Sequence, residues 1–460
     1  MPDRSAVLAQ ESYNMTSTTQ ILARYIVNAK PEDIPAAVER EGQRCLLHWI
    51  GCSIGGSHEA SVDVALAAVQ EIAGAGAASL LGRGERLDLA HAAFINGVSA
   101  DVLSFSDTHP PTLIHAGGVI GSAALALAER HPTSGRDFLN ALIIGYEVAC
   151  RIGLSIYPWH YTRGWHITGT AGIFGAAAAA GKILRLDEQH MLWALGIAAT
   201  QSAGLREMFG SMSKNLHIGR AAQNGLVSAL FASKGFTSSQ QSLEAPRGFT
   251  HVLGENPDLD VITRNLGKTF EILLNTYKPY PCGVVIHPII EGCVNLATAH
   301  DLKPGDIRSV SLRCNPLVIE LCGKERPATT LEAKLSVYHS AAAALIARRM
   351  TDFEYRPAFI ERADVLALRA RVAVTVERKI REDETEVVVE LDGGARFTCH
   401  IDHVIGSAAR PMSDADMERK FRGLTEPVLP QAQVDQLIES CRNVAQLDDV
   451  AVLARLAAKR

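Results

Sequence analysis

Four clusters of polar residues interrupt an otherwise apolar, glycine-punctuated sequence, and they hold the residue types that could do chemistry. The first cluster runs from Ser106 to Gly118. Two prolines prevent a helix there, so Asp107, Thr108 and His115 are expected on a loop. A capped turn between two helices would also use Asp107 and Thr108, so this cluster alone does not define a site.

The second cluster, from Tyr161 to Thr170, places His166 directly before an alanine- and glycine-rich run. If this run is a helix, its N-terminus would stabilise a bound carboxylate, because backbone N–H groups and the helix dipole point there. The alternative is that His166 is a buried histidine whose hydrogen bonds are satisfied by the protein.

The third and fourth clusters each contribute a lysine. Lys214 has small neighbours and precedes an apolar helix, which suits an anion-binding lysine, although an exposed loop lysine would look the same. Lys278 and His287 lie in a segment made irregular by prolines and a glycine, which could instead be a rigid strap between domains. Cys282 in this segment is interpreted as a packing residue.

Together the clusters favour acid–base chemistry on an anionic substrate, in which lysines hold carboxylates and histidines move protons. No cofactor is expected, because the sequence has no CxxC or HExxH metal motif and no phosphate-binding glycine loop. Gly51 to Gly55 matches GxSxG, but a helical pattern precedes it. A nucleophile elbow needs a strand there, so we interpret these residues as a glycine-rich helix end.

The elements that carry these clusters are predicted from hydrophobic spacing. From Thr18 to about Asn265, apolar residues recur every three or four positions, which predicts helices almost throughout. Small residues dominate Gly121–Ala128 and Ala171–Gly181, so these helices are expected to pack closely at the centre. This pattern does not fit a Rossmann fold.

After Gly305 the spacing changes to alternation, as in 307–314 and 372–376, which predicts strands. Two further strand-like runs flank Asp392-Gly-Gly, a hairpin-turn sequence. The tail is helical again, with a capped helix beginning at Ser413. We therefore predict a mainly α protein, with an all-α domain formed by residues 1–272 and 406–460 and a smaller α+β domain formed by residues 273–405.

Composition excludes several classes of protein. The chain has 460 residues, with 45 Lys+Arg against 50 Asp+Glu and 47% hydrophobic residues, as in globular proteins with more than one core. The mild acidity and the lack of a basic tract argue against nucleic acid as a partner. The most apolar stretch, 168–184, is interrupted by Lys182, so no membrane partner is expected. Nine scattered cysteines and an N-terminus without a signal-peptide pattern predict a cytoplasmic protein.

The motifs, in this order, resemble those of the MmgE/PrpD family, which includes 2-methylcitrate dehydratase, cis-aconitate decarboxylase and iminodisuccinate epimerase. The resemblance covers nearly the whole chain. The matching motifs are Cys52-Ser-Ile-Gly-Gly, Asn96-Gly, Ser106-Asp-Thr, Gly145-Tyr-Glu-Val-Ala-Cys-Arg-Ile, Gly164-Trp-His, Lys214 with His217-Ile-Gly-Arg-Ala, Tyr280-Pro-Cys, Glu332-Ala-Lys and Lys420-Phe421.

The resemblance implies a homodimer with a cofactor-free active site between an all-α domain and an inserted α+β domain. Lys214 and Lys278 would anchor carboxylates of the substrate. His115 and His166 would be the acid–base pair, and His287 would orient the substrate or relay a proton. Asp107 and Thr108 would hold the loop that carries His115.

Two positions depart from the family pattern. Ser104 stands where the family commonly has an acid, and His339 takes the place of a tyrosine, so His339 is expected to contact the substrate. We therefore predict a lyase, a dehydratase or decarboxylase acting on a small di- or tricarboxylate. The alternative is an epimerase of an amino- or imino-dicarboxylate, and a non-catalytic carboxylate-binding protein is the rival from another class.

Overall fold

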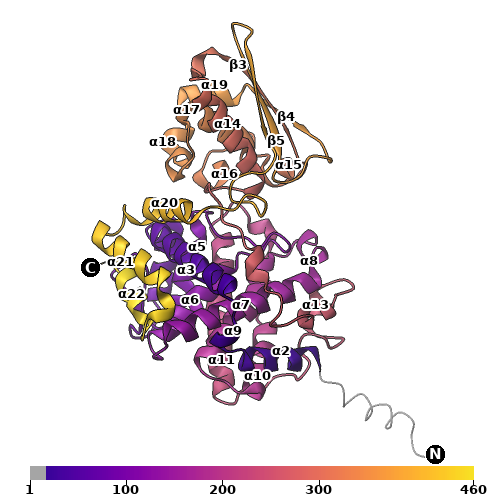
Figure 1. Ribbon diagram of the computed structural model, residues 1–460, viewed down its shortest axis with the longest axis vertical. Coiled ribbons are helices and arrows are strands. Elements are labelled where there is room, and N and C mark those ends of the chain that lie inside the picture. Colours follow the sequence, from indigo (N-terminus) through magenta and orange to yellow (C-terminus); the bar gives the residue numbers. More distant parts are fainter. Residues whose placement is uncertain (1–16, 460) are drawn as a thin grey trace, which may run out of the picture.

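The computed structural model describes residues 17–459, and it has two bodies stacked along its long axis (Figure 1). The larger body is helical and the smaller one combines helices with a sheet. Each body encloses a hydrophobic core of its own. The predicted fold class, mainly α with a smaller α+β part, is confirmed.

The helical body contains the first part of the chain. Its helices are α2 (Thr18–Asn28), α3 (Ala36–Gly56), α4 (Ala60–Gln70), α5 (Leu89–Val102), α6 (Ala116–Ala128), α7 (Gly135–Ile156), α8 (Trp159–Thr162), α9 (Ile167–Ile183), α10 (Glu188–Ala199), α11 (Ser213–Ser233), α12 (Phe249–Leu253) and α13 (Asp260–Thr263). It also holds a hairpin of two very short strands, β1 (Ala78–Ser79) and β2 (Arg86–Leu87), which the sequence did not predict.

Helices α6 and α9 lie at the centre of this body, as their small residues predict, and α5, α7 and α11 surround them. Helices α7 and α9 cross so closely that a Cβ added at Gly145 would lie 2.7 Å from the carbonyl oxygen of Gly175. In the described part of the chain, α7 is the one helix long and apolar enough to span a membrane, and nearly all of it is buried in this core. It begins at a serine cap, where Ser134 Oγ accepts a hydrogen bond from the Asp137 backbone N–H.

The second body contains a four-stranded sheet of order β4-β3-β5-β6. Strands β3 and β4 are parallel, whereas the other two pairs are antiparallel. Helices α14 and α17 pack against the sheet (Figure 1). The elements are α14 (His287–Ala299), β3 (Ile307–Cys314), α15 (Leu317–Cys322), α16 (Thr330–Ala333), α17 (Val337–Ala347), α18 (Pro357–Ile360), α19 (Ala363–Arg369), β4 (Val372–Val376), β5 (Thr385–Leu391) and β6 (Arg396–Ile401).

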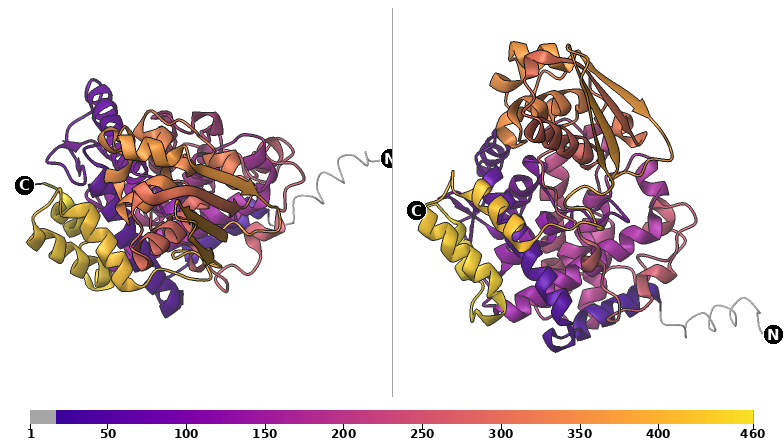
Figure 2. Two further views of the ribbon diagram at one scale, coloured as in Figure 1. Left: turned by 90° about the horizontal axis from the view of Figure 1, so that it is seen from above. Right: turned by 45° about the horizontal axis from the view of Figure 1, so that its top comes forward.

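The tail returns to the helical body as α20 (Asp414–Thr425), α21 (Gln431–Arg442) and α22 (Ala451–Ala457). Figures 1 and 2 show these yellow helices on the helical body in every view. Helix α20 packs on α3, where the buried Phe421 ring lies directly over Gly51, and a Cβ there would come within 2.7 Å of the ring. Gly51 is inside α3, so the GxSxG match is a packing site and not a nucleophile elbow.

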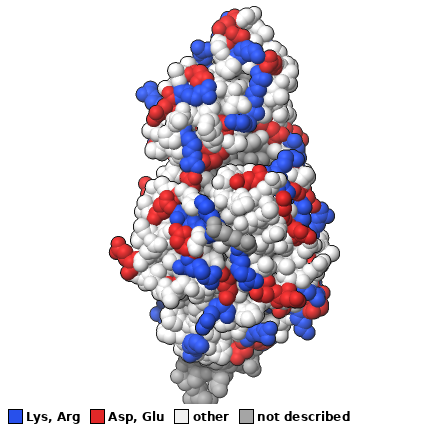
Figure 3. All heavy atoms as spheres, turned by 90° about the vertical axis from the view of Figure 1, so that its left-hand side faces the viewer, with Lys and Arg blue, Asp and Glu red and all other residues white. Residues whose placement is uncertain are grey.

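Charges on the surface are mixed. Over the face drawn in Figure 3, acidic and basic side chains alternate on both bodies, and no extended basic patch is visible. This face therefore offers no continuous positive field to the phosphate backbone of a nucleic acid.

Gly51→Ala should therefore destabilise the protein. The new methyl group displaces the Phe421 ring, and overpacking of roughly 1–3 kcal/mol outweighs the ~1 kcal/mol that alanine contributes to helix propensity. Gly423→Ala on α20 is the matched control, because a Cβ there meets open space and should stabilise the protein. Urea unfolding of both variants measures the difference, and a more stable Gly51→Ala protein would contradict this account of how α20 docks.

Candidate active site

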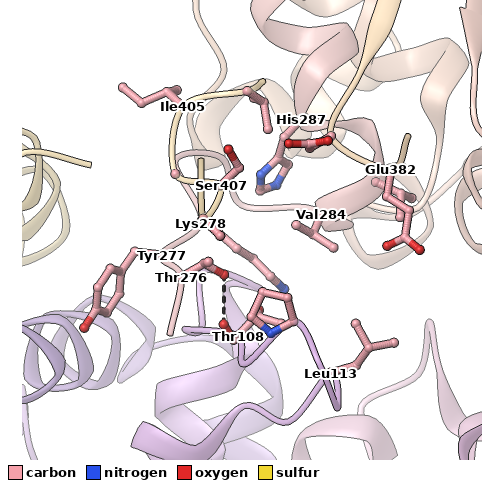
Figure 4. A pocket seen from close by; sticks show the side chains of 16 residues that line it. Thr108, Leu113, Thr276, Tyr277, Lys278, Val284, His287, Glu382, Ile405 and Ser407 are labelled. Atoms are coloured by element: carbon pink, nitrogen blue, oxygen red, sulfur yellow. Dashed lines mark hydrogen bonds between the residues drawn. The ribbon is translucent and has the colours of Figure 1, made fainter. Parts of the chain in front are cut away.

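A cavity of about 210 Å³ lies between the two bodies (Figure 4). The helical body contributes the loop between α5 and α6, and the second body contributes the start of α14. A crossing segment, defined here as residues 276–278, and a strap, residues 404–408, complete the wall. The lining residues are Thr108, Pro110, Leu113, Thr276, Tyr277, Lys278, Val284, Val285, His287, Glu382, Asp383, Val404, Ile405, Gly406, Ser407 and Ala408.

The crossing segment is held by main-chain pairing. Thr108 and Thr276 form an antiparallel bridge in which each backbone N–H donates to the other's carbonyl oxygen at 2.8 Å. The Thr276 hydroxyl donates to the same Thr108 carbonyl at 2.8 Å. This bridge fixes the backbone next to Lys278 against the loop that carries His115.

Lys278 and His287 meet at this cavity from the crossing segment and from α14 (Figure 4). Burial, together with the charge of Lys214, lowers the pKa of Lys278 to about 8. Burial and then the charge of Lys278 hold the pKa of His287 well below its usual value, so the imidazole is neutral at pH 7. His287 is 1% exposed and its Nε2 has no hydrogen-bond partner within the described residues. That atom is free to take or give a proton.

His115 is oriented by its own loop. Its Nδ1 donates to the Asp107 carbonyl at 2.7 Å and lies 3.2 Å from Thr108 Oγ1, which leaves Nε2 for a ligand. Burial, followed by the charges of Lys278 and Lys214, lowers the pKa of His115 to about 3. His115 is therefore a second neutral imidazole near the cavity.

Asp107 anchors this loop and does not line the cavity. Its buried carboxylate accepts hydrogen bonds from the Tyr146 hydroxyl and, at 3.3 Å, from the Gly117 N–H. Burial raises the pKa of Asp107. The carboxylate thus connects the loop to α6 and α7, while Thr108 lines the cavity.

Lys214 is already paired within the protein. Its ammonium lies 2.8 and 3.0 Å from the carboxylate oxygens of Asp101, which also accepts a hydrogen bond from Ser106 at 2.7 Å. Burial alone would raise the pKa of Asp101, but the charge and hydrogen bonds of Lys214 outweigh burial and hold that pKa well below its usual range. Asp101 was not predicted from the sequence. It could have been found because it is an acid about one helical turn before Ser104, the position where the family commonly has an acid.

His166 is paired with His217. Their Nδ1 atoms are 2.9 Å apart, so one of them carries the proton and the other accepts it. Burial, then the charge of Lys214, lowers the pKa of both rings, and both are neutral at pH 7. His166 begins α9 as expected, but it is 1% exposed and does not line the cavity. His217, named only within a motif of the resemblance, is its hydrogen-bond partner.

His339 is not brought to the cavity. It is fully buried in the second body, where Nε2 lies 2.8 Å from the Glu354 carbonyl and the ring packs on Tyr355, with ring centroids 5.7 Å apart. Ser336 caps α17 and places this side of the helix against residues 352–355. The expectation that His339 contacts substrate does not fit this position, because core packing and not the cavity surrounds it.

Lys334 ties the two bodies together beside the cavity. It is 3% exposed, and its ammonium donates to the Leu103 carbonyl at 3.1 Å and to Asp352 at 2.8 Å. Its own carbonyl accepts a hydrogen bond from Gly283 N at 3.1 Å. Lys334 thereby connects the end of α5 to the segment that leads into His287.

Two carboxylates lie on the remaining wall. Asp383 is 2.6 Å from the His403 imidazole, whereas Glu382 has no ion pair in the described part of the chain. Within residues 17–459, no group of three potential metal-ligating side chains converges here or elsewhere. Lys278 is thus the cation of the cavity lining, and the neutral imidazole of His287 and the carboxylates of Glu382 and Asp383 share that lining.

Comparison with known proteins identifies the family. The MmgE/PrpD N-terminal domain matches residues 20–262 and the MmgE/PrpD C-terminal domain matches residues 280–444. The chain therefore belongs to the MmgE/PrpD family, which confirms the resemblance seen in the motifs. It is 26% identical to a cis-aconitate decarboxylase of Aspergillus terreus over 97% of each chain, and 28% identical to that of Homo sapiens over 81% of this chain and 80% of the relative.

Asp101→Asn should destabilise the protein by roughly 3 kcal/mol, because it leaves the Lys214 ammonium without its buried partner charge. The estimate is at the low end for a buried pair because the Lys214 side chain is 18% exposed. Urea unfolding at pH 7 measures the change. Asp301→Asn, which removes an exposed carboxylate paired with Lys303 and Arg348, should leave the midpoint nearly unchanged. Equal midpoints for the two variants would show that the buried pair contributes nothing.

Proposed function

We propose that this protein is a lyase that acts on a small di- or tricarboxylate by proton transfer at carbon next to a carboxylate, without a metal or organic cofactor. The observation that carries the proposal is the buried, unpartnered His287 Nε2 at a cavity that also holds Lys278. In such a pair the ammonium binds a carboxylate, and the neutral imidazole beside it transfers a proton at the neighbouring carbon. Several relatives are named cis-aconitate decarboxylase, so cis-aconitate is the first substrate to test.

In this mechanism Lys278 holds one carboxylate of the substrate. Its positive charge also stabilises the enolate-like charge that develops when carbon loses a proton or CO2. The Asp101 carboxylate already pairs with Lys214, so Lys214 is less available than Lys278 to bind a carboxylate of the substrate. Lys278 is therefore the main ionic anchor of the proposal.

The histidines move the proton. The negative charge of the bound carboxylates raises the pKa of a neighbouring imidazole, which can then take up a proton from solvent. For a decarboxylation, the C–C bond to the leaving carboxylate breaks, CO2 departs, the electron pair stays on carbon, and this imidazolium delivers its proton to that carbon. For a dehydration, a neutral imidazole takes the proton from carbon while an imidazolium formed in the same way protonates the departing hydroxyl, which leaves as water. His115 and His287 each have a free Nε2, and His166 is proposed to exchange protons with His217 behind them.

Epimerisation of an amino- or imino-dicarboxylate is the second candidate. The observation that favours it is that His115 and His287 come from different bodies and both are neutral. Two bases that come from different bodies could remove a proton from one face of a carbon and return one to the other face. This arrangement would need no leaving group.

His287→Gln should lower kcat by roughly 10²–10⁴ with little change in KM, because glutamine fills the space but cannot transfer the proton. His300→Gln is the matched control, since His300 is exposed at the other end of α14 and should leave kcat unchanged. The assay is proton NMR in deuterated buffer with citrate, 2-methylcitrate, cis-aconitate, succinate and aspartate derivatives. Product formation identifies a lyase, and deuterium uptake without a new product identifies an epimerase.

Two results would contradict the proposal. A folded His287→Gln enzyme with near wild-type kcat would remove His287 from proton transfer. Binding of these carboxylates by the wild-type protein without deuterium uptake or product would leave only the non-catalytic, carboxylate-binding function.

Activity should also survive exhaustive dialysis against EDTA, because the proposed steps use only lysine and histidine side chains. The check is kcat/KM before and after dialysis, with one aliquot resupplied with Mg²⁺, Mn²⁺, Fe²⁺ or Zn²⁺. Activity that is lost on chelation and restored by one of these ions would overturn the cofactor-free mechanism.

A further inference from the structure

Lys420 reaches the site from the far end of the chain. It lies on α20, and its ammonium is 2.7 Å from the Lys278 carbonyl, 3.1 Å from the Phe105 carbonyl and 2.7 Å from His48 Nε2. An ammonium group has three N–H bonds, so these three acceptors use all of them. The ammonium also lies 4.5 Å from the centre of the Phe105 ring.

Each acceptor belongs to a different segment of the chain. His48 is on α3, Phe105 begins the loop that carries His115, and Lys278 is in the crossing segment. The Thr108–Thr276 bridge also holds the loop and the crossing segment together. Thr108 follows Phe105 by three residues, and Thr276 precedes Lys278 by two. Lys420 supplies a second connection between them, directly at the Lys278 main chain.

We propose that Lys420 is a positioning residue of this active site, which holds the Lys278 backbone against the Phe105 loop so that the Lys278 ammonium is presented to a carboxylate in the cavity. This inference deepens the proposed function and rests on it. Lys420 donates to the Lys278 carbonyl, and it is absent from the cavity lining. It therefore acts through Lys278.

The docking of α20 places this lysine. Phe421, the next residue, is buried over Gly51 of α3, and this contact fixes how far along α3 the tail helix lies. Without Lys420, two backbone carbonyls and His48 Nε2 would lose their donor, and each unsatisfied buried acceptor costs about 1–3 kcal/mol. The segment would shift to satisfy them, and a displacement of about 1 Å at a reacting or binding group can cost ~10²-fold in rate.

Lys420 also sets the electrostatics of Lys278. Burial lowers the pKa of both lysines to about 8, and their like charges oppose each other. The groups whose charges affect the pKa of Lys278 most are Lys214, Asp101, Cys282 and Cys322, so the effect of Lys420 is smaller than theirs. Removing the Lys420 charge should therefore raise the pKa of Lys278.

The experiment compares Lys420→Met with Lys420→Arg and with Lys182→Met as the matched control. Lys182 also donates to two backbone carbonyls, those of Ile26 and Ala29 at 2.8 and 2.7 Å, but it lies on α9 away from the cavity. Circular dichroism confirms folding. Competitive acetylation with acetic anhydride, measured at the Lys278 peptide by mass spectrometry across pH, titrates Lys278 without any substrate, and calorimetry measures the Kd of cis-aconitate.

Lys420→Met is expected to raise the pH at which Lys278 titrates and to raise the Kd of cis-aconitate about tenfold or more. Lys420→Arg keeps the charge but cannot match three acceptors with a planar group, so it should raise the Kd with little change in the titration. Lys182→Met should change neither. A folded Lys420→Met protein with wild-type titration and wild-type Kd would overturn the proposal, as would a Lys182→Met protein with the same losses.

Failure of the proposed function gives a different result. If the wild-type protein neither binds nor converts any carboxylate tested, the proposed function fails, and the acetylation titration still decides whether Lys420 controls Lys278. If Lys420→Met does not fold, Lys420→Arg decides alone. A wild-type Kd overturns the proposal and a raised Kd supports it. Where no carboxylate binds, the limiting rate of Lys278 acetylation at high pH, which reports the position of the amine and not its pKa, replaces the Kd: a wild-type limiting rate overturns the proposal and a changed rate supports it.

Discussion

The candidate active site depends on buried lysine ammonium groups. Each of them donates hydrogen bonds to main-chain carbonyls of a segment other than its own. Lys334 of the second body donates to Leu103 of the helical body, and Lys420 of the tail donates to Phe105 and Lys278. A buried ammonium without acceptors is costly, so the segments cannot move apart without breaking these bonds. The cavity walls are therefore fixed by hydrogen bonds of the backbone, in a region between the two hydrophobic cores.

These same groups determine the electrostatics of the cavity. Lys214, Lys278 and Lys420 bring three ammonium groups close together, and the Asp101 carboxylate pairs with only Lys214. The positive charge around Lys278 favours an anion there, and burial together with the lysine charges lowers the pKa values of His115 and His287, so that both imidazoles are neutral. The proposed carboxylate binding and the proposed proton transfer by histidines thus have one common cause.

The geometry around the histidines also fixes which ring nitrogen is available. The Asp107 carbonyl holds the Nδ1 proton of His115, and the Nδ1 atoms of His166 and His217 share one proton. The carboxylate of Asp107 does not take part directly, because Tyr146 and the Gly117 N–H bind it. The Asp107 carboxylate therefore orients the loop, and the Asp107 carbonyl orients the His115 ring.

The sequence by itself determined the local structure. Helical spacing, the serine caps at Ser134 and Ser413 and the Asp392-Gly-Gly turn are interactions between near neighbours, so the helices and the hairpin could be predicted from them. The clusters around His115 and around Lys278 were predicted for a related reason. Prolines and glycines prevent regular structure there, and polar groups on irregular backbone between apolar elements indicate a site.

Tertiary structure alone decided which of these residues work together. Asp101 and Lys214 are 113 residues apart in the sequence, and Lys278 and Lys420 are 142 residues apart. No rule of local residue spacing predicts contacts between residues so far apart in the chain. His339 stands where the family often has a tyrosine, yet the packing of α17 buries it away from the cavity. Local spacing fixes the conformation of each segment, whereas the partners of a buried charge are fixed by the packing of the whole chain.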